Sequence, residues 1–256
     1  MSRLAGKKAV IVGGSSGLGK DAARAFIAEG ADVLIAARDE AKLSAAASEL
    51  GAHAFQCDLT DWEAGQSLRD EAIKVFDGAI DVAVNCAGYE DRFGVIEQEP
   101  ERVEKMVAVQ FTAGLYFLQH MAQAMPKGGS LVTMSSLTAT LIAEGYAAYA
   151  GAKAGLNHAC RIAASELGHL GIRVNIVSPT VVDTPMVAEL LATPGVRASL
   201  EYETPLGALP ETQDVSNALV WLASDESRFV NGQNIHLDGG GNMRRLPRPG
   251  EFERFA

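Results

Sequence analysis

The chain has 256 residues, of which 48% are hydrophobic and 21% are charged, and its net charge at pH 7 is −10. This composition is ordinary for a globular protein with one large domain or two small ones. The excess of acidic residues argues against a nucleic-acid partner, because binding to phosphates requires a basic face.

Short apolar, β-branched runs alternate along the chain with longer helical patterns. We expect strands at 8–14, 32–37, 53–58, 81–87, 130–135, 172–178 and 234–238, and helices at 20–29, 39–50, 61–76, 100–125, 147–168 and 212–223. This order predicts an α/β fold, a doubly wound Rossmann-type parallel sheet of about seven strands with helices on both faces. No linker or repeat interrupts it, so residues 1–256 are expected to form a single domain.

The first expected strand runs into the glycine-rich stretch VGGSSGLGKDAARAF, residues 12–26. Gly13, Gly17 and Gly19 form a G-x-x-x-G-x-G pattern that opens directly onto a helix. Glycine permits a tight turn and a close approach of the backbone to a pyrophosphate, and the helix N-terminus offers it free N–H groups. The pattern therefore predicts a dinucleotide site, with a flexible Gly/Ser loop as the alternative.

The second expected strand ends in Ala36 and Ala37, followed by Arg38. A site that prefers NAD usually has an acidic residue at this strand end, where it binds the ribose 2′-OH. A guanidinium would instead bind a 2′-phosphate, and Ser15 would add a hydroxyl. We therefore expect NADP(H) to be preferred over NAD(H); the alternative is that Arg38 is an exposed residue at the start of a helix.

Tyr149 and Lys153 lie four residues apart in a stretch composed almost entirely of Ala and Gly. Residues at this spacing share one face of a helix. A positive charge near a phenol favours the phenolate, which lowers a pKa that starts near about 10 and makes tyrosine a usable acid or base at neutral pH. The alternative is a solvated lysine beside a core tyrosine.

Cysteine and histidine spacing gives no indication of a metal site. The three cysteines are sparse, which suits a reducing compartment, and the five histidines are scattered. No apolar run approaches the ~20 residues of a membrane helix, and the apolar stretch at the N-terminus is too short for a signal peptide. We therefore expect a cytoplasmic protein without a membrane partner.

In combination, these motifs resemble the short-chain dehydrogenase/reductase (SDR) family, in its compact single-domain branch, from Leu4 to about Gly240. Ser136 stands thirteen residues before Tyr149, the spacing that this family uses. The matching segments are GGSSGLG (13–19), DLT (58–60), NCAG (85–88), TMSS (133–136), YAGAK (149–153), IRVNIVSPTVVDTP (172–185) and GQNIHLDGG (232–240).

The resemblance implies hydride transfer between NADP(H) and a ketone or secondary alcohol. It makes Tyr149 the general acid and base, Ser136 a hydrogen-bond donor to the reacting oxygen, and Lys153 the residue that holds the nicotinamide ribose and lowers the pKa of Tyr149. Besides Tyr149 and Lys153, the expected cofactor contacts are Gly13, Ser15, Ser16, Gly17, Leu18, Gly19, Arg38, Asp58, Leu59, Asn85, Ala87, Gly88, Pro179, Val182 and Thr184.

Structural roles stand as alternatives for three of these residues. Ser136 would then be a turn residue or helix cap, Asp58 would close a turn, and Asn85 would tie the fourth strand to its neighbour. The alternative function is that of a sensor or scaffold that binds NADP(H) and has little or no turnover.

The sequence departs from the family pattern at three positions. Gln110 stands where the family commonly has an Asn that is implied to hold a water linking the lysine to solvent, so we expect a working but rearranged relay. Thr180 replaces a glycine near the expected nicotinamide site, where its β-branched side chain adds bulk. Cys86 replaces a second Asn, and we interpret it as a structural substitution.

A substrate loop is expected at 184–205, where Met186, Val187, Leu190 and Leu191 either cover an apolar substrate or only close a lid on the core. Segments 89–99 and 142–146 would form the other walls. The family implies a homodimer or homotetramer with contacts through 100–125, 147–168 and the last strand. The tail 241–256 is expected to be mobile; in the alternative, Phe252 and Phe255 dock on a neighbouring subunit.

Overall fold

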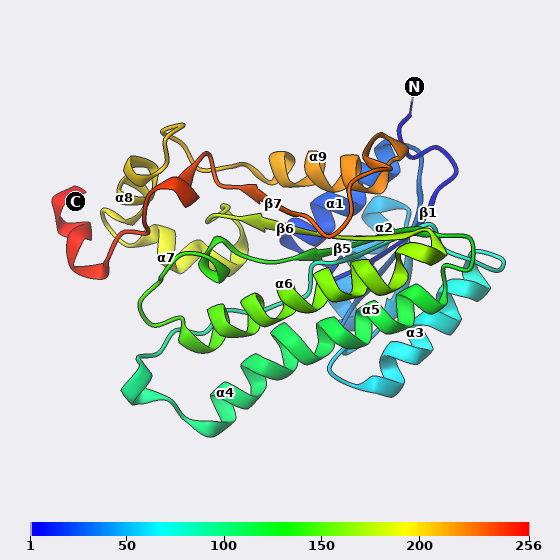
Figure 1. The fold of residues 1–256 in the computed structure, drawn as a ribbon, viewed down its shortest axis with the longest axis horizontal. Coiled ribbons are helices and arrows are strands. Elements are labelled where there is room, and N and C mark those ends of the chain that lie inside the picture. The colour runs from blue at the N-terminus through cyan, green and yellow to red at the C-terminus, as the bar shows by residue number, and fades with distance from the viewer. Residues whose placement is uncertain (1, 256) are drawn as a thin grey trace.

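Seven parallel strands form one sheet at the centre of the computed structural model, which describes residues 2–255 (Figure 1). The strands are β1 (Lys8–Val12), β2 (Asp32–Ala37), β3 (His53–Gln56), β4 (Val82–Asn85), β5 (Gly129–Met134), β6 (Ile172–Pro179) and β7 (Asn234–Leu237). Their spatial order is β3-β2-β1-β4-β5-β6-β7, and each neighbouring pair runs parallel. The expected doubly wound sheet is confirmed, and the order reverses between β1 and β4, where such folds bind ligands.

Helices cover both faces of this sheet (Figure 1). The first face carries α1 (Gly17–Ala28), α2 (Glu40–Leu50) and α9 (Thr212–Ala223), and the second carries α3 (Trp62–Val75), α5 (Ala113–Gln123) and α6 (Ala147–Leu167). Successive residues of a strand serve opposite faces: on β1, Ile11 packs into the first core and Val10 into the second. Burial on both sides explains why the strands read as continuous apolar runs.

The long helix expected at 100–125 is interrupted. It consists of α4 (Pro100–Val107), a π-helical turn (Ala108–Thr112) and α5. A π-turn adds one residue to a helix without ending it, and such turns are frequent at functional sites. The turn includes Gln110, one of the positions where the sequence departs from the family pattern.

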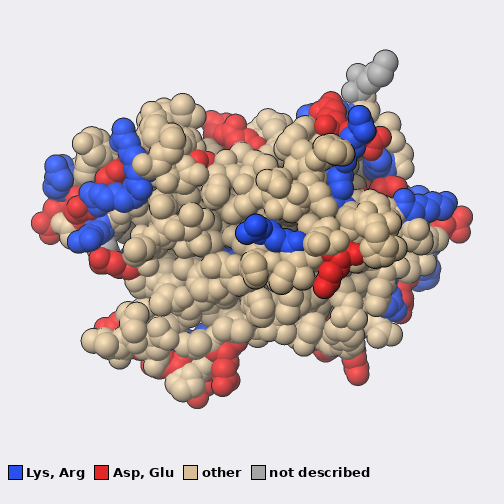
Figure 2. Space-filling model, viewed as in Figure 1, with Lys and Arg blue, Asp and Glu red and all other residues tan. Residues whose placement is uncertain are grey.

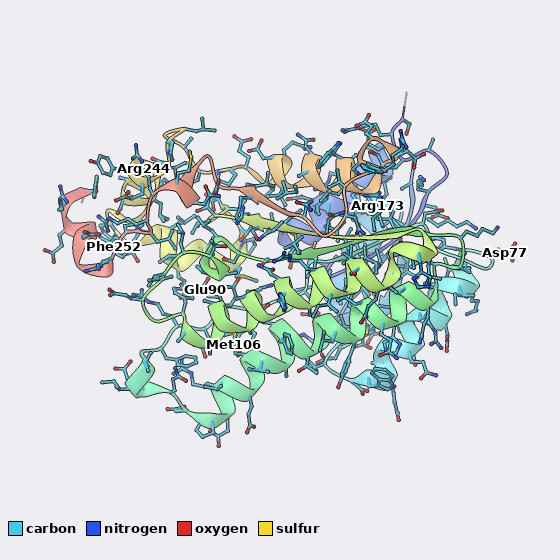
Figure 3. All side chains as sticks on the ribbon, viewed as in Figure 1. Asp77, Glu90, Met106, Arg173, Arg244 and Phe252 are labelled. Carbon is cyan, nitrogen blue, oxygen red and sulfur yellow. The ribbon has the colours of Figure 1, made fainter. Side chains whose placement is uncertain are left out.

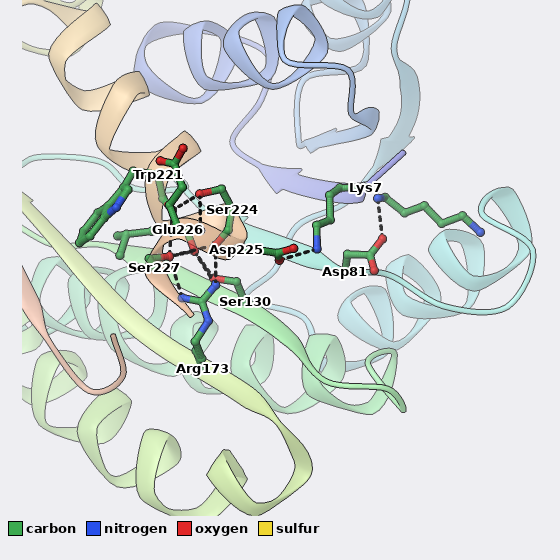
Figure 4. A network of polar contacts seen from close by, with 11 residues as sticks. Lys7, Asp81, Ser130, Arg173, Trp221, Ser224, Asp225, Glu226 and Ser227 are labelled. Atoms are coloured by element: carbon green, nitrogen blue, oxygen red, sulfur yellow. Dashed lines mark hydrogen bonds and ion pairs between the residues drawn. The ribbon is translucent and has the colours of Figure 1, made fainter. Parts of the chain in front are cut away.

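An arginine network fixes α9 at the amino-terminal edge of the sheet (Figure 4). Arg173 on β6 donates to the Ser227 hydroxyl at 3.0 Å and to the Leu222 carbonyl at 2.9 Å. Ser130 on β5 donates to the same carbonyl at 2.8 Å. These bonds brace one edge of the sheet, and the opposite edge, where the strands end, is left for a binding site.

The expected substrate loop is largely helical. It contains the short helix α7 (Ala188–Ala192) and α8 (Val196–Glu203). In the C-terminal tail, residues 249–255 form a 3-10 helix that packs against α8 of the same chain. Ion pairs hold it there, since Arg245 lies 3.1 Å from Glu203 and 2.6 Å from Glu251. Among the described residues, no helix combines the length and apolarity needed to cross a membrane.

Candidate active site

A pocket opens at the carboxyl ends of β4, β5 and β6. Its inner wall includes Gly88 after β4, Ser136 after β5, and Tyr149 and Lys153 from α6. The three residues expected to carry the chemistry therefore lie in one pocket, although 17 residues separate the first from the last. The helix α6 brings Tyr149 and Lys153 to the same wall because they are one turn apart.

Lys153 is buried and lines the pocket. Nζ donates to the carbonyl oxygen of Met134, the last residue of β5, at 2.8 Å. Burial lowers the pKa of Lys153 to about 8. Nζ lies 5.9 Å from the centroid of the Tyr149 ring.

The pKa of Tyr149 does not follow the sequence-based expectation. Burial raises it to about 12, and the Ser136 side chain opposes this shift while the negative charge of Glu90 adds to it. Lys153 is not among the causes of this shift. The physical reason is that the pocket removes water from the phenol, and the ammonium is engaged by Met134 rather than by the phenol oxygen.

Ser136 has a local structural role as well as its place in the pocket. Its Oγ accepts hydrogen bonds from the backbone N–H of Thr138 at 3.2 Å and from the Thr138 hydroxyl at 2.9 Å. It thus caps the short 3-10 helix Leu137–Ala139. The helix-cap role and the catalytic placement are compatible, because the cap fixes the side chain in the pocket wall.

The glycine-rich turn is packed too closely for side chains at two positions. Gly13 has φ +81°, and a Cβ there would lie 2.8 Å from the backbone nitrogen of Ala87. A Cβ on Gly19 would lie 2.3 Å from the carbonyl oxygen of Gly13. The turn therefore brings the start of α1 against the loop after β4, as a close backbone cradle for a diphosphate requires.

The start of α1 also suits an anion. Ser16 is its N-cap, but no side-chain hydrogen bond satisfies the first N–H groups, and the first turn contains no acidic residue. Ser15 and Gly17 belong to the same turn, and Leu18 faces the pocket. Free N–H groups and the positive end of the helix dipole favour a phosphate at this point. The residues present thus fit a dinucleotide.

Arg38 lies beside this cradle. The N–H groups of Gly13 and Gly14 donate to the carbonyl of Ala36 at 2.7 and 3.3 Å, so the turn is bonded to the end of β2. Arg38 follows two residues later and is exposed. The adjacent carboxylate, Asp39, is used as the N-cap of α2 and accepts from the Lys42 N–H at 3.0 Å.

The residues expected around the adenine and the diphosphate differ in burial. Asp58 is exposed, and its Oδ1 accepts from the Thr60 N–H at 3.0 Å and from the Thr60 hydroxyl at 2.8 Å, so it closes a turn. Leu59 is buried in the core. Asn85 is buried, and its Oδ1 accepts from the Ala87 N–H at 3.0 Å. Asn85 therefore shapes its own loop instead of tying β4 to a neighbouring strand.

Gln110 reaches the pocket from the π-turn. Its side chain is 2% exposed, and Nε2 donates to the carbonyl of Tyr89. The Oε1 atom is buried and has no hydrogen-bond partner among the described residues. A Cβ on Gly88 would lie 3.2 Å from Nε2, so the amide fills the space that this glycine leaves. An unpaired buried acceptor of this kind fits the expectation that Gln110 binds a water.

We expect Gln110→Asn to produce no large rise in turnover. The shorter side chain removes the Tyr89 contact and places the acceptor differently, so the natural residue is matched to its own geometry. Steady-state kcat of the two proteins is the measurement. An increase of about tenfold or more in the Asn variant would show that the glutamine impairs the relay.

The loop after β6 forms the pocket wall that faces the glycine-rich turn. Pro179, Val182 and Thr184 all line the pocket, and Thr184 lies within 3.9 Å of the position that a Cβ on Gly17 would take. The loops after β1 and β6 therefore face one another across the site. Thr180 also lines the pocket.

Cys86 lies in the pocket lining next to the glycine turn. Burial raises the pKa of its thiol to about 12, so the thiol stays protonated and weakly nucleophilic. This agrees with the interpretation of Cys86 as a structural substitution. Within residues 2–255, no group of His, Cys, Asp and Glu has an arrangement that would hold a metal ion.

The outer walls agree only in part with the sequence expectations. Met186, Val187 and Leu190 line the pocket, whereas Leu191 does not. Val196 and Leu200 also line the pocket and lie within the expected substrate loop, whereas Leu246, Pro247 and Phe252 were not expected at the pocket of their own chain. The first two come from α8, but no local signal places the last three beside Ser136 and Tyr149, which lie more than 90 residues earlier in the chain.

A second phenol also lies in this pocket. Tyr146 donates a hydrogen bond to the carboxylate of Glu90, and its ring centroid is 5.9 Å from that of Tyr149. Burial and the Glu90 carboxylate raise the pKa of Tyr146 above its ordinary value. Tyr146 and Glu90 both lie in segments that were expected to form pocket walls, but their pairing was not predicted from the sequence.

The fold and this pocket define a dinucleotide-binding oxidoreductase. A family model described as enoyl-(acyl carrier protein) reductase matches residues 12–242. The chain is 34% identical to trans-4-hydroxycyclohexanecarboxylate dehydrogenase of Sinomonas cyclohexanicum, covering 93% of each chain. It is 34% identical to 3beta-hydroxysteroid dehydrogenase 1 of Eggerthella lenta, covering 93% of this chain and 94% of the relative.

The same result comes from a solved structure. A short-chain type dehydrogenase/reductase from Mycobacterium ulcerans superimposes with a TM-score of 0.92 at 31% identity, covering 95% of this chain and 93% of that one. The chain belongs to the short-chain dehydrogenase/reductase family. Members of this family use nicotinamide cofactors.

Proposed function

We propose that the protein transfers a hydride between NADP(H) and a ketone or secondary alcohol, with Tyr149 as the general acid and base. The observation that carries this proposal is the meeting of Ser136, Tyr149 and Lys153 in one pocket beside the glycine turn. The alternative, a sensor or scaffold that binds NADP(H) without turnover, gives no reason for all three groups to share a pocket wall.

The proposed chemistry follows from the positions of these three side chains in one pocket. With a pKa of about 12, Tyr149 holds its proton at neutral pH and is able to donate it to a carbonyl oxygen during reduction. Ser136 would hydrogen-bond the same oxygen, and Lys153 would hold the nicotinamide ribose. When bound, the nicotinamide ring supplies or accepts the hydride. In the oxidation direction, Tyr149 would accept the proton from the alcohol.

We propose an alicyclic substrate. The two curated relatives named above are, by their names, dehydrogenases of a hydroxycyclohexane acid and of a hydroxysteroid. The pocket offers apolar side chains to such a ring body from the substrate loop, among them Met186, Val187 and Leu200. The absorbance of NADPH, followed with a panel of cyclic ketones and diketones, tests the proposal. Tight NADPH binding without oxidation on any member of the panel would favour the sensor.

We propose that Arg38 gives the site its preference for NADP(H). Arg38→Asp is expected to raise the Kd for NADPH about 10- to 100-fold, because it removes charge-assisted hydrogen bonds to a 2′-phosphate and adds a repelling carboxylate. The Kd for NADH should stay the same or fall. Fluorescence titration with both cofactors is the measurement.

Arg228→Asp provides a matched control for Arg38→Asp, since Arg228 is also exposed and lies outside the pocket. This control should leave both Kd values unchanged. If wild-type protein bound NADH more tightly than NADPH, the assignment of Arg38 would be wrong.

We propose a homodimer or homotetramer that assembles through α5 and α6. A groove between these helices is lined by apolar side chains, and Leu115 and Ile162 are 37% and 48% exposed. The face of the molecule shown in Figure 2 carries few charged side chains across its middle. Light scattering of the purified chain measures the assembly directly.

A further inference from the structure

The C-terminal segment, residues 244–255, lies across the mouth of the pocket of its own chain. We call this segment the strap. It runs along the end of the molecule that carries α7 and α8, and Figure 3 places Phe252 and Glu90 at that same end. Because Glu90 lines the pocket, the strap and the proposed reaction site are close neighbours.

One side of the strap is attached to α8. Arg244 donates from Nη1 to the carbonyl of Tyr202 at 2.8 Å, and the rings of Phe255 and Tyr202 have centroids 5.3 Å apart. Arg245 bridges two carboxylates, with Nη2 at 3.1 Å from Glu203 and Nη1 at 2.6 Å from Glu251. A single guanidinium therefore joins α8 to the short 3-10 helix of the strap.

The other side of the strap reaches the loop before α6. Nε of Arg248 lies 3.6 Å from a carboxylate oxygen of Glu144, three residues before the helix that carries Tyr149. The backbone N–H of Arg248 also donates to Glu251 at 2.8 Å. The strap thus spans the pocket mouth from α8 to the opposite wall. Figure 2 shows the resulting mixture of acidic and basic side chains at this end of the molecule.

Apolar side chains of the strap face inward between these two attachments. Leu246, Pro247 and Phe252 line the same pocket as Tyr149 and Ser136. Phe255, three residues further along, instead packs on Tyr202 and does not line the pocket. The two phenylalanines therefore have different positions: Phe252 faces the substrate space, and Phe255 holds the strap to α8.

We propose that Phe252 is a specificity-determining residue that contacts the part of the substrate remote from the reacting carbon, and that Arg245 is a positioning residue that holds Phe252 there. This inference rests on the proposed ketone and alcohol chemistry and narrows the proposed alicyclic substrate to one whose far side is apolar. An apolar group against Phe252 gains hydrophobic contact, whereas a charged group there would lose its water.

The first test is Phe252→Ala with 4-methylcyclohexanone as the probe. We expect KM for this ketone to rise about tenfold, because one apolar wall of the site is lost, with kcat and the Kd for NADPH within about twofold of wild type. Phe229→Ala is the matched control, since Phe229 is 95% exposed and lies outside the pocket. An unchanged KM in Phe252→Ala would overturn the proposal.

The second test addresses the attachment of the strap to α8 through Arg245. Arg245→Ala should raise KM by a similar factor with kcat unchanged, and Arg245→Lys should recover only part of the loss, because an ammonium does not bridge two carboxylates as a guanidinium does. Arg254→Ala is the matched control on the same segment; within residues 2–255 its guanidinium contacts only the Phe255 ring, 6.0 Å from the ring centroid. Equal effects of Arg245→Ala and Arg254→Ala would contradict a positioning role for Arg245.

A third measurement does not depend on turnover. Trypsin should cleave after Arg245 at least about tenfold more slowly in the folded protein than in a synthetic peptide of residues 241–255, because the docked strap is withheld from the protease. Cleavage at the rate of the peptide would overturn the docking. If the protein reduced no ketone but the strap stayed protected, the proposed function would fail while the docking in cis remained supported.

Discussion

Replacing Tyr149 with Phe is expected to lower the rate of ketone reduction by about 10²- to 10⁴-fold, the contribution of one positioned general acid. The variant keeps the ring, so the pocket wall stays filled, and it removes only the hydroxyl group. Lys153 and the glycine turn are untouched, and NADPH should bind as it does to the wild type. NADPH oxidation and NADPH titration measure the two quantities separately.

The second phenol of the pocket supplies the control for this experiment. Tyr146→Phe also removes one hydroxyl group from the same cavity, together with its hydrogen bond to Glu90. It should lower kcat by less than about tenfold, since the hydroxyl of Tyr146 is already engaged by a carboxylate. Equal losses in the two variants would mean that the assignment of the general acid to Tyr149 is incorrect.

Gly19→Ala is expected to remove most of the affinity for NADPH and to destabilise the protein. The new methyl group would lie 2.3 Å from the Gly13 carbonyl oxygen and 3.2 Å from Cβ of Cys86. The first of these is a backbone atom, so the turn has to move and the diphosphate cradle opens. We expect a rise in the Kd for NADPH of at least about tenfold and a loss of about 1–3 kcal/mol in the free energy of unfolding.

Gly151→Ala is the control for Gly19→Ala, because it makes the same substitution at a glycine that is not crowded. A Cβ at Gly151, in the first turns of α6, would meet no atom within 4 Å. Alanine there should stabilise the protein by about 0.5–1 kcal/mol, because glycine is a poor helix former. Thermal melts and NADPH titrations of both variants suffice. Normal cofactor binding in Gly19→Ala would refute the close-packed turn.

Local patterns were enough to predict the sheet and the position of the glycine turn. Each strand is a short apolar run with its own boundary residues, and the parallel order follows from the alternation with helices. The boundaries were less accurate: α1 begins at Gly17 and not at residue 20, because the helix starts within the glycine-rich turn itself. The π-turn at Ala108–Thr112 was missed because it leaves no periodic signal distinct from the surrounding helix.

The pocket was predictable only where the resemblance supplied a motif. Ser136, Tyr149 and Lys153 were found by spacing, and the structure brings them to one wall. The raised pKa of Tyr149 depends on burial and on Glu90, which is 59 residues away in the sequence. The strap depends on pairs such as Arg248 with Glu144, more than 100 residues apart, and no local pattern encodes such a contact.

The π-turn also limits which insertions and deletions this chain tolerates. A π-turn accommodates one extra residue by winding more widely than the roughly 3.6 residues per turn of an α-helix, so removing one residue between Ala108 and Thr112 would restore regular α-helical winding while α4 and α5 kept their present faces. The Gln110 amide would swing away from Gly88 while the core face of α5 stayed in register with the sheet. Homologues that lack this extra residue must therefore fill the space beside Gly88 from another position.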